Sequence, residues 1–315
     1  MKENRELSKP AFVQKADMAL ADIIAGGKLV ADQRKKFILV NIKGQVMMSR
    51  IRVTTMKRET EEIPKMTTFG TQVWYPGTES QALTLAQRSK PGFDKVTLTS
   101  KEVVCQVDYP RYVLQDQIEG PQFHSTMIGY LGLHTKRDFE NLICNGDTGS
   151  ANTLLAMFDG LITDAASNTY AAGGIALSST VLGLTKKTMP SEYRVQPGLK
   201  YFTGEVAYDA YWAEWEARIG SLGDNALVNA TGLKFRGVEV LEVPLFPSTL
   251  GAGGNQTVVM YMDPKQFIFA FHEDVELQSE YNIRERVWTV VVTARVAQGY
   301  EHEPAVVKTT GVLGA

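Results

Sequence analysis

The chain has 315 residues, of which 44% are hydrophobic and 22% are charged, and its net charge is −2 at neutral pH. This composition is that of an ordinary globular protein with a packed core. No apolar run reaches the roughly 18 residues of a membrane span, and two cysteines do not make a disulfide framework. We therefore expect synthesis in a reducing cytoplasm and no membrane contact.

The N-terminal segment is basic. Residues 1–58 hold 13 Lys and Arg against 5 Asp and Glu, a net charge of +8, and the rest of the chain carries −10. Such asymmetry indicates an arm that meets an acidic surface; a solvated, mobile terminus is equally compatible with it. Helical patterns are predicted at residues 14–24 and from Asp32 to Arg50.

The next segment has the character of a long hairpin. Residues 51–63 favour a strand that Pro64 breaks, and "TFGTQVWYPG" predicts a further strand that ends at a Pro76-Gly77 turn. A polar stretch follows before the chain returns at Pro91-Gly92. A polar loop of this length inside a compact domain is usually functional.

The return strand, residues 90–110, changes its apolar face along its length. Val96 and Leu98 occupy even positions, whereas Val103, Cys105 and Val107 occupy odd positions. Side chains of a strand alternate between two faces, so the two halves must meet different environments. A projecting arm whose base enters the domain would explain the switch, and so would a β-bulge near Ser100 within one sheet.

The second half of the chain mixes helices and strands. A long helix is predicted at residues 121–145, followed by Gly146 at its C′ position, with a shorter helical stretch after it. From residue 177, helical and strand patterns alternate in a manner typical of a compact α/β unit. The tail from Trp288 predicts a long strand pair with an apolar face, which consists of Trp288, Val290, Val292, Ala294 and Val296.

Catalytic signatures are absent from the sequence. It contains no Walker loop, nucleophile elbow, HExxH or CxxC motif, and its four histidines do not make a metal pair at helical spacing. We therefore predict no catalytic, cofactor-binding or metal-ligating residue.

The succession of segments resembles a tailed-phage major capsid protein of the Hong Kong 97 fold. The residues that carry the resemblance are "KPGFDKVTLTSKEV", the helix that ends in "CNGD", and the tail "DPKQFIFAFHEDVELQSE…VWTVVVTARVAQGYEHEPAVVK". It spans residues 28–312, and its specificity comes from the order of the parts.

The resemblance implies an α+β fold with an N-arm, an extended β-hairpin loop, a peripheral domain with a long spine helix, and an axial α/β domain. The implied boundaries are an N-arm at 1–50, peripheral segments at 51–64 and 106–176, an extended loop at 65–105, an axial domain at 177–274 and peripheral return strands at 275–315. The resemblance favours the arm over the bulge as the cause of the face change.

The implied function is self-assembly as hexamers and pentamers into an icosahedral shell around phage double-stranded DNA, in a virion assembled in the bacterial host cytoplasm. The chain itself is the main partner, with portal, scaffolding or decoration proteins as further partners and non-specific DNA contact. The candidate intersubunit contacts all lie in the extended loop: Trp74, Tyr75, Leu83, Leu85, Arg88, Lys90, Phe93 and Lys95. Some relatives join subunits by a Lys–Asn crosslink, but nothing in this sequence identifies an Asn partner for Lys90 or Lys95.

Two alternatives stay open. An encapsulin-type nanocompartment shell has the same fold, and a neighbouring cargo-enzyme gene would distinguish it. A two-domain enzyme that uses Asp147 or Asp159 belongs to another class of protein, and turnover by a small monomer would support it.

Overall fold

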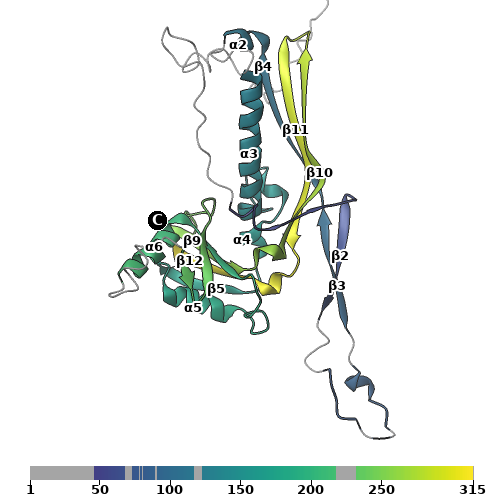
Figure 1. Ribbon diagram of the computed structural model, residues 1–315, viewed down its shortest axis with the longest axis vertical. Helices are drawn as coiled ribbons and strands as arrows, with labels where there is room; N and C mark the ends of the chain where they lie inside the picture. Colours follow the sequence, from purple (N-terminus) through teal and green to yellow (C-terminus); the bar gives the residue numbers. More distant parts are fainter. Residues whose placement is uncertain are drawn as a thin grey trace, which may run out of the picture.

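The structure is a computed structural model that describes residues 46–67, 73–77, 79, 81–88, 91–116, 123–217 and 232–314. Its described part contains two packed sheets with their helices and a two-stranded ribbon that extends away from them (Figure 1). The helices predicted at residues 14–24 and from Asp32 onward therefore lie outside the described residues, except for the last residues of the second.

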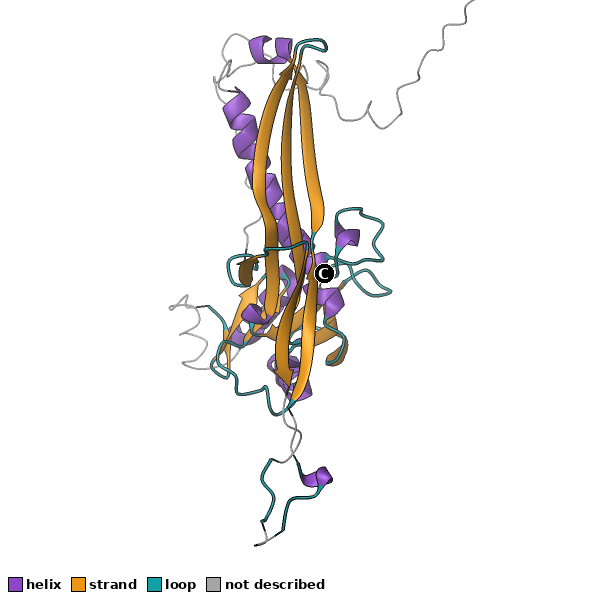
Figure 2. Ribbon diagram, turned by 90° about the vertical axis from the view of Figure 1, so that its right-hand side faces the viewer, coloured by secondary structure: helices purple, strands orange, loops and turns teal. Residues whose placement is uncertain are grey.

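A four-stranded sheet runs along the long axis of the molecule beside a single long helix (Figures 1 and 2). Its strand order is β1-β10-β11-β4, with β1 parallel to β10 and the other neighbours antiparallel. The strands are β1 (Arg52–Thr55), β4 (Lys101–Pro110), β10 (Phe267–Asn282) and β11 (Val287–Tyr300). The predicted apolar face of β11 is buried from Val290 to Val296. It shares a core with the helix, in which the rings of Phe139 and Phe269 lie 5.8 Å apart.

The long helix α3 (Phe123–Asn145) confirms the predicted helix, with residues 121 and 122 outside the described part. Its 23 residues correspond to about 35 Å at 1.5 Å per residue. Gly146 follows the helix, and its backbone is not left-handed. A glycine is needed there for lack of space. A Cβ at Gly146 would lie 2.5 Å from the carbonyl oxygen of Phe158, so a side chain has no room there. The short helical segments η4 (Leu155–Met157) and α4 (Leu161–Asp164) come next, and α2 (Arg111–Asp116) precedes the long helix.

A six-stranded sheet forms the second unit, in the order β5-β12-β9-β6-β8-β7. Its strands are β5 (Thr169–Ile175), β6 (Lys200–Thr203), β7 (Lys234–Phe235), β8 (Val238–Glu242), β9 (Gln256–Met262) and β12 (Val307–Leu313). The helices α5 (Ser179–Thr188) and α6 (Glu205–Glu216) pack on it, and the turns η5 (Pro264–Gln266) and η6 (Glu303–Ala305) lead out of β9 and into β12. The central strand β9 is buried on both faces from Thr257 to Met262, as expected for a strand covered on both sides.

The predicted pairing of the two tail strands is wrong. β11 lies in the four-stranded sheet, whereas β12 lies between β5 and β9 in the other sheet. β12 buries Val307 and Val312 in the second core, which gives the C-terminal strand a partner that its local pattern does not specify. As a consequence, β5 and β12 belong to the sheet that we expected to contain only residues 177–274.

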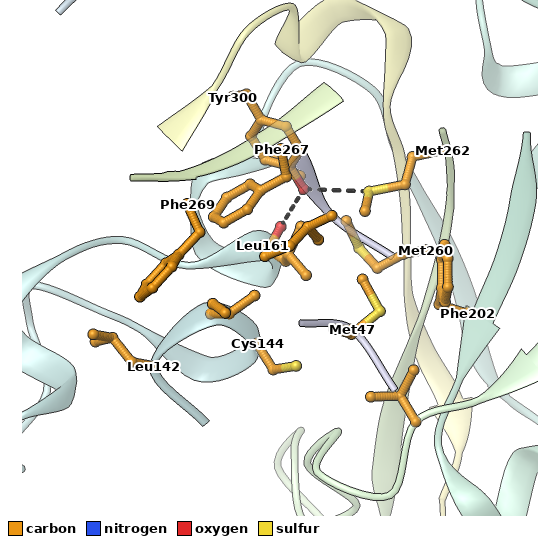
Figure 3. Packing of buried hydrophobic residues seen from close by; sticks show 14 of the residues in the cluster. Met47, Leu142, Cys144, Leu161, Phe202, Met260, Met262, Phe267, Phe269 and Tyr300 are labelled. Atoms are coloured by element: carbon orange, nitrogen blue, oxygen red, sulfur yellow. Dashed lines mark hydrogen bonds between the residues drawn. The ribbon is translucent and has the colours of Figure 1, made fainter. Parts of the chain in front are cut away.

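One hydrophobic cluster joins the two units (Figure 3). Phe267 and Tyr300 come from the long sheet, Met260 and Met262 come from β9, and all four are buried. The Tyr300 hydroxyl donates a hydrogen bond of 2.9 Å to the Leu161 carbonyl. Because both sheets contribute to this one core, we expect the two units to unfold together.

The ribbon consists of β2 (Thr60–Thr67) and β3 (Gly92–Thr99), which pair only with each other. β3 and β4 are separated by the single residue Ser100 and lie in different sheets. This arrangement excludes a bulge within one sheet and shows that the two halves of the return strand belong to different sheets, with Val96 and Leu98 at the base of the ribbon facing the long sheet of the same subunit.

Two local predictions in the ribbon are wrong. β2 continues through Pro64, which is paired with Lys95. An edge strand tolerates proline because its outward side needs no N–H donor. Residues 73–77, predicted as the end of a strand, have no regular structure, and the rest of that predicted strand at 68–72 lies outside the described residues.

Candidate assembly surface

The loop beyond the ribbon carries the most exposed large apolar side chains of the predicted contact set. Trp74 is 88% exposed and Leu85 is 81% exposed, and Phe93 at the start of β3 is 75% exposed. Leu83 is exposed as well. Large apolar side chains that a monomer leaves exposed along one segment mark a surface that another molecule covers.

The other predicted contact residues are less prominent. Tyr75 is half-buried and Arg88 is exposed. Lys90 lies outside the described residues. Lys95 donates to Glu62 across the ribbon in a 2.6 Å ion pair, so its charge already has a partner within the subunit. The structure thus leaves the apolar members of the set exposed and pairs Lys95 within the ribbon.

A short 3₁₀ turn, η2 (Leu85–Gln87), holds Leu85 outward. The Thr84 backbone N–H donates 3.0 Å to the Gln87 side-chain oxygen, which closes a capping box. The Arg88 side chain donates 3.3 Å to the Leu83 carbonyl from the other side of the turn. These local bonds give the turn a defined shape, and none of the described residues 81–88 is buried.

Cross-strand pairs set the register of the ribbon. Lys65 and Asp94 form a second ion pair at 3.3 Å. The backbone N–H of Lys95 and the Lys65 side chain hold the pKa of Asp94 below its ordinary value. Exposed pairs of this kind contribute little stability, but they favour one register over its neighbours.

Met66 is a contact candidate that the sequence analysis missed. It is 64% exposed and lies directly opposite Phe93 in the ribbon, so the two side chains form one apolar patch. The signal is the register of the hairpin: once Thr67 is paired with Gly92, Met66 must face Phe93.

The root of the ribbon is fixed to the long sheet. Leu98 is buried against Ile268 and Ala297, with Val96 packed beside it. Gly299 makes room for this contact, because a Cβ there would lie 3.3 Å from the Leu98 side chain. The ribbon therefore has a packed base and an exposed outer end.

A buried carboxylate anchors the chain where residues 1–45 join the described part. Glu140 of α3 has no exposed surface, and its two oxygens accept the backbone N–H groups of Val46, Met47 and Met48 at 2.8, 2.6 and 2.7 Å. The Met47 side chain is buried in the shared core (Figure 3). Residues 47–51 are turns and bends, so the predicted helix up to Arg50 is wrong at its end.

Asp147 and Asp159, the candidate residues of the enzyme alternative, stabilise the loop that carries them. Asp147 accepts the Gly149 N–H at 2.8 Å, and Asp159 accepts the backbone N–H and hydroxyl of Thr148 at 2.8 and 3.0 Å. Both carboxylates thus act as turn-stabilising acceptors. The described residues contain no group of three or more His, Cys, Asp or Glu that could hold a metal ion.

None of the helices in the described ranges is both long and apolar enough to cross a membrane.

Comparisons with known proteins agree with this architecture. Residues 26–311 match the profile of the phage capsid family. The prophage capsid protein YqbE of Bacillus subtilis (strain 168) is 28% identical over 308 residues, which are 94% of this chain and 96% of that protein.

Solved structures are similar over most of the chain. The capsid of the native GTA particle matches with a TM-score of 0.67 at 14% identity, over 93% of this chain and 100% of that chain. The capsid of Myoviridae phage XM1 matches with a TM-score of 0.65 at 12% identity, over 91% and 100%. At such identities the likeness shows the fold, and it confirms the predicted fold class.

Proposed function

This chain belongs to the phage capsid family as a major capsid protein, and we propose that its copies join as hexamers and pentamers into an icosahedral shell around phage double-stranded DNA. The observation that carries the proposal is the ribbon with its exposed loop. It projects from a closed core (Figure 1) and leaves Trp74, Leu85 and Phe93 exposed in the subunit. Repeated contacts between unlike surfaces of identical subunits build closed shells without any catalytic step.

Each unit of the fold corresponds to one part of the subunit in this proposal. We assign the four-stranded sheet and α3 to a peripheral domain, the six-stranded sheet to an axial domain, residues 60–99 to the extended loop and residues 1–50 to the N-arm. In this assignment β5 and β12 are part of the axial domain. Assembly takes place in the bacterial host cytoplasm, and portal, scaffolding or decoration proteins are further partners.

Electron microscopy of the purified full-length protein tests the proposal. We expect rings, tubes or shells at moderate protein concentration. A monodisperse monomer at every salt and crowder concentration, with or without a candidate scaffold, would contradict it.

Replacing Trp74 with alanine should weaken assembly without changing the fold. Its side chain is 88% exposed in the subunit, so its removal costs the subunit little. A large aromatic that becomes buried at an interface is often worth about 2 kcal/mol or more. Light scattering should therefore show a higher critical concentration for assembly, with an unchanged thermal midpoint. Gln81→Ala, an exposed polar change in the same loop, is the control, and equal behaviour of the two variants would remove Trp74 from the contact.

The basic N-terminal segment should contribute electrostatically. Deleting residues 1–36 removes eight Lys and Arg and five Asp and Glu, a net +3 of the +8 charge of residues 1–58, which we propose to dock on acidic surface of neighbouring subunits or on packaged DNA. Exposed charge contacts are screened over about 8 Å at physiological salt. We expect weaker assembly with a smaller dependence on salt concentration, followed by light scattering from low to high salt. Identical curves for the full and shortened chains would show that the segment takes no part.

A further inference from the structure

The six-stranded sheet unit contains a basic cleft. It opens beside the end of α5, residues 194–199 and strands β6, β7 and β8, and its volume is ≈ 390 Å³. Four cationic side chains line it: Lys186, Arg194, Lys200 and Lys234. Among the described residues that line the cleft, Glu239 is the one carboxylate, which leaves an excess of three positive charges.

The single carboxylate is already committed to one of the cations. Glu239 accepts a 2.7 Å hydrogen bond from Lys200, and this bond holds the pKa of Glu239 below its ordinary value. Lys186 and Arg194 therefore lie in the cleft without a carboxylate partner among the described residues that line it, whereas Lys234 lies opposite Glu239 in the β7–β8 pair and shares that carboxylate with Lys200. Like charges brought together repel one another, and an anion between them would relieve the repulsion.

A buried hydroxyl lines the same cleft. Tyr261 of β9 has no exposed surface, and its hydroxyl makes no hydrogen bond within the described ranges of the chain. Its ring stacks on Tyr201 with centroids 4.4 Å apart, whereas the Tyr201 hydroxyl donates to the Leu182 carbonyl at 3.2 Å. Buried polar groups almost always have a partner, so the Tyr261 hydroxyl calls for one that the described residues do not supply.

The donors of the cleft are held in position. The Arg194 Nε donates 2.6 Å to the Met189 carbonyl, and its Nη2 donates to the Lys187 carbonyl, which orients the guanidinium. Burial raises the pKa of Tyr261 more than the nearby Arg194 charge lowers it, so the hydroxyl keeps its proton and can donate. Fixed donors around a positive cleft suit a compact anion with several acceptor oxygens.

We propose that this cleft binds an oxyanion of the phosphate or sulfate class, with Lys186, Arg194 and Lys234 supplying the charge and the Tyr261 hydroxyl donating a hydrogen bond. The site is independent of the proposed loop contacts, because it lies in the six-stranded sheet unit and shares no residue with the loop. It gives the six-stranded sheet unit a ligand-binding role in addition to its role in the shell.

Titration of the full-length protein with inorganic phosphate tests the site, with sodium chloride of equal ionic strength as the reference. Isothermal calorimetry or phosphorus NMR line widths should report saturable binding. Tyr261→Phe, which keeps the stacked ring, should weaken binding about fivefold to tenfold, as expected for one lost hydrogen bond. Lys186→Gln should weaken binding about tenfold. Lys187→Gln, an exposed neighbour on the same helix that does not line the cleft, should bind as the unaltered protein does.

Several results would overturn the proposal. They are a response to phosphate no larger than that to chloride, equal effects of Lys186→Gln and Lys187→Gln, and unchanged binding in Tyr261→Phe. Loss of assembly in Lys186→Gln without phosphate binding in the unaltered protein would assign the cleft to a carboxylate of a neighbouring copy instead. A short DNA duplex added to the titration distinguishes the source of the anion. Competition would identify backbone phosphate, and its absence would identify free phosphate.

Discussion

Replacing residues 68–91 with an Asn-Gly turn is expected to leave a folded, soluble subunit that no longer assembles. Thr67 and Gly92 are register partners, so a two-residue turn can close the ribbon at that point. The described residues of the removed segment include none that is buried, and the packed root at Leu98 is retained. The thermal midpoint should therefore shift by only a few degrees, because the stability resides in the two packed sheets. Electron microscopy and sedimentation velocity should show subunits or small oligomers in place of shells.

A variant of full loop length separates the loss of contact residues from the shortening itself. Trp74→Ser combined with Leu85→Ser removes the two most exposed large apolar side chains among the described residues of the loop and keeps its backbone. We expect it to assemble poorly as well. Insoluble protein after the deletion would place the loop in the folding core, and shells formed at the usual concentration would end its role as an assembly contact.

The passage from the ribbon into the four-stranded sheet could be predicted from the sequence, because the apolar side chains change from even to odd positions there. Val96 and Leu98 point to one side of their strand and Val103 and Val107 to the other, and a strand alternates strictly between its faces. The structure places the change at Ser100, between two strands of different sheets. Alternation depends on residues that are neighbours in the sequence, so it can be recognised without knowing which strands pair.

Partner choice is not contained in such a local pattern. β12 has the same apolar alternation whether it pairs with β11 or enters between β5 and β9. Its position depends on the space that β5 and β9 leave open, and those strands are far away in sequence. The same holds for Pro64, whose place in a strand depends on that strand being an edge.

Glu140 is an example of a residue whose burial can be predicted from the sequence but whose partner cannot. A carboxylate on the buried side of a helix, next to Phe139 and before Leu142, signals a specific partner, because buried charges are almost never left uncompensated. The sequence cannot name that partner, since the N–H groups that it accepts are 92 to 94 residues away. They are backbone groups as well, which no side-chain pattern reveals.

The environment of Glu140 indicates how much depends on it. None of the ion pairs formed by the described residues includes Glu140, so the three N–H groups compensate its charge. Burial raises the pKa of the neighbouring Cys144 thiol, and the charge of Glu140 raises it further. Hydrogen bonds to a charged group are worth about 1.5–3 kcal/mol each, and orphaned buried donors add their desolvation cost.

The Val46 and Met48 groups are only partly buried, so water can replace part of these contacts. Glu140→Ala should therefore lower the free energy of unfolding by about 3–5 kcal/mol, with a fall of roughly 5–10 °C in the thermal midpoint. Loss of the three acceptor contacts should also release residues 46–48 from α3, so trypsin should cut at Arg50 sooner than in the unaltered protein.

Asp138→Ala, an exposed change two residues earlier on the same helix, is the matched control and should shift the midpoint by a degree or so. Glu140→Gln keeps one acceptor oxygen and should lie between the two, which preserves the comparison if the alanine variant does not fold. Calorimetry and mass spectrometry of the tryptic fragments provide the two measurements. If all three variants melt together and are cleaved at the same rate, the carboxylate does not anchor residues 46–48 to α3.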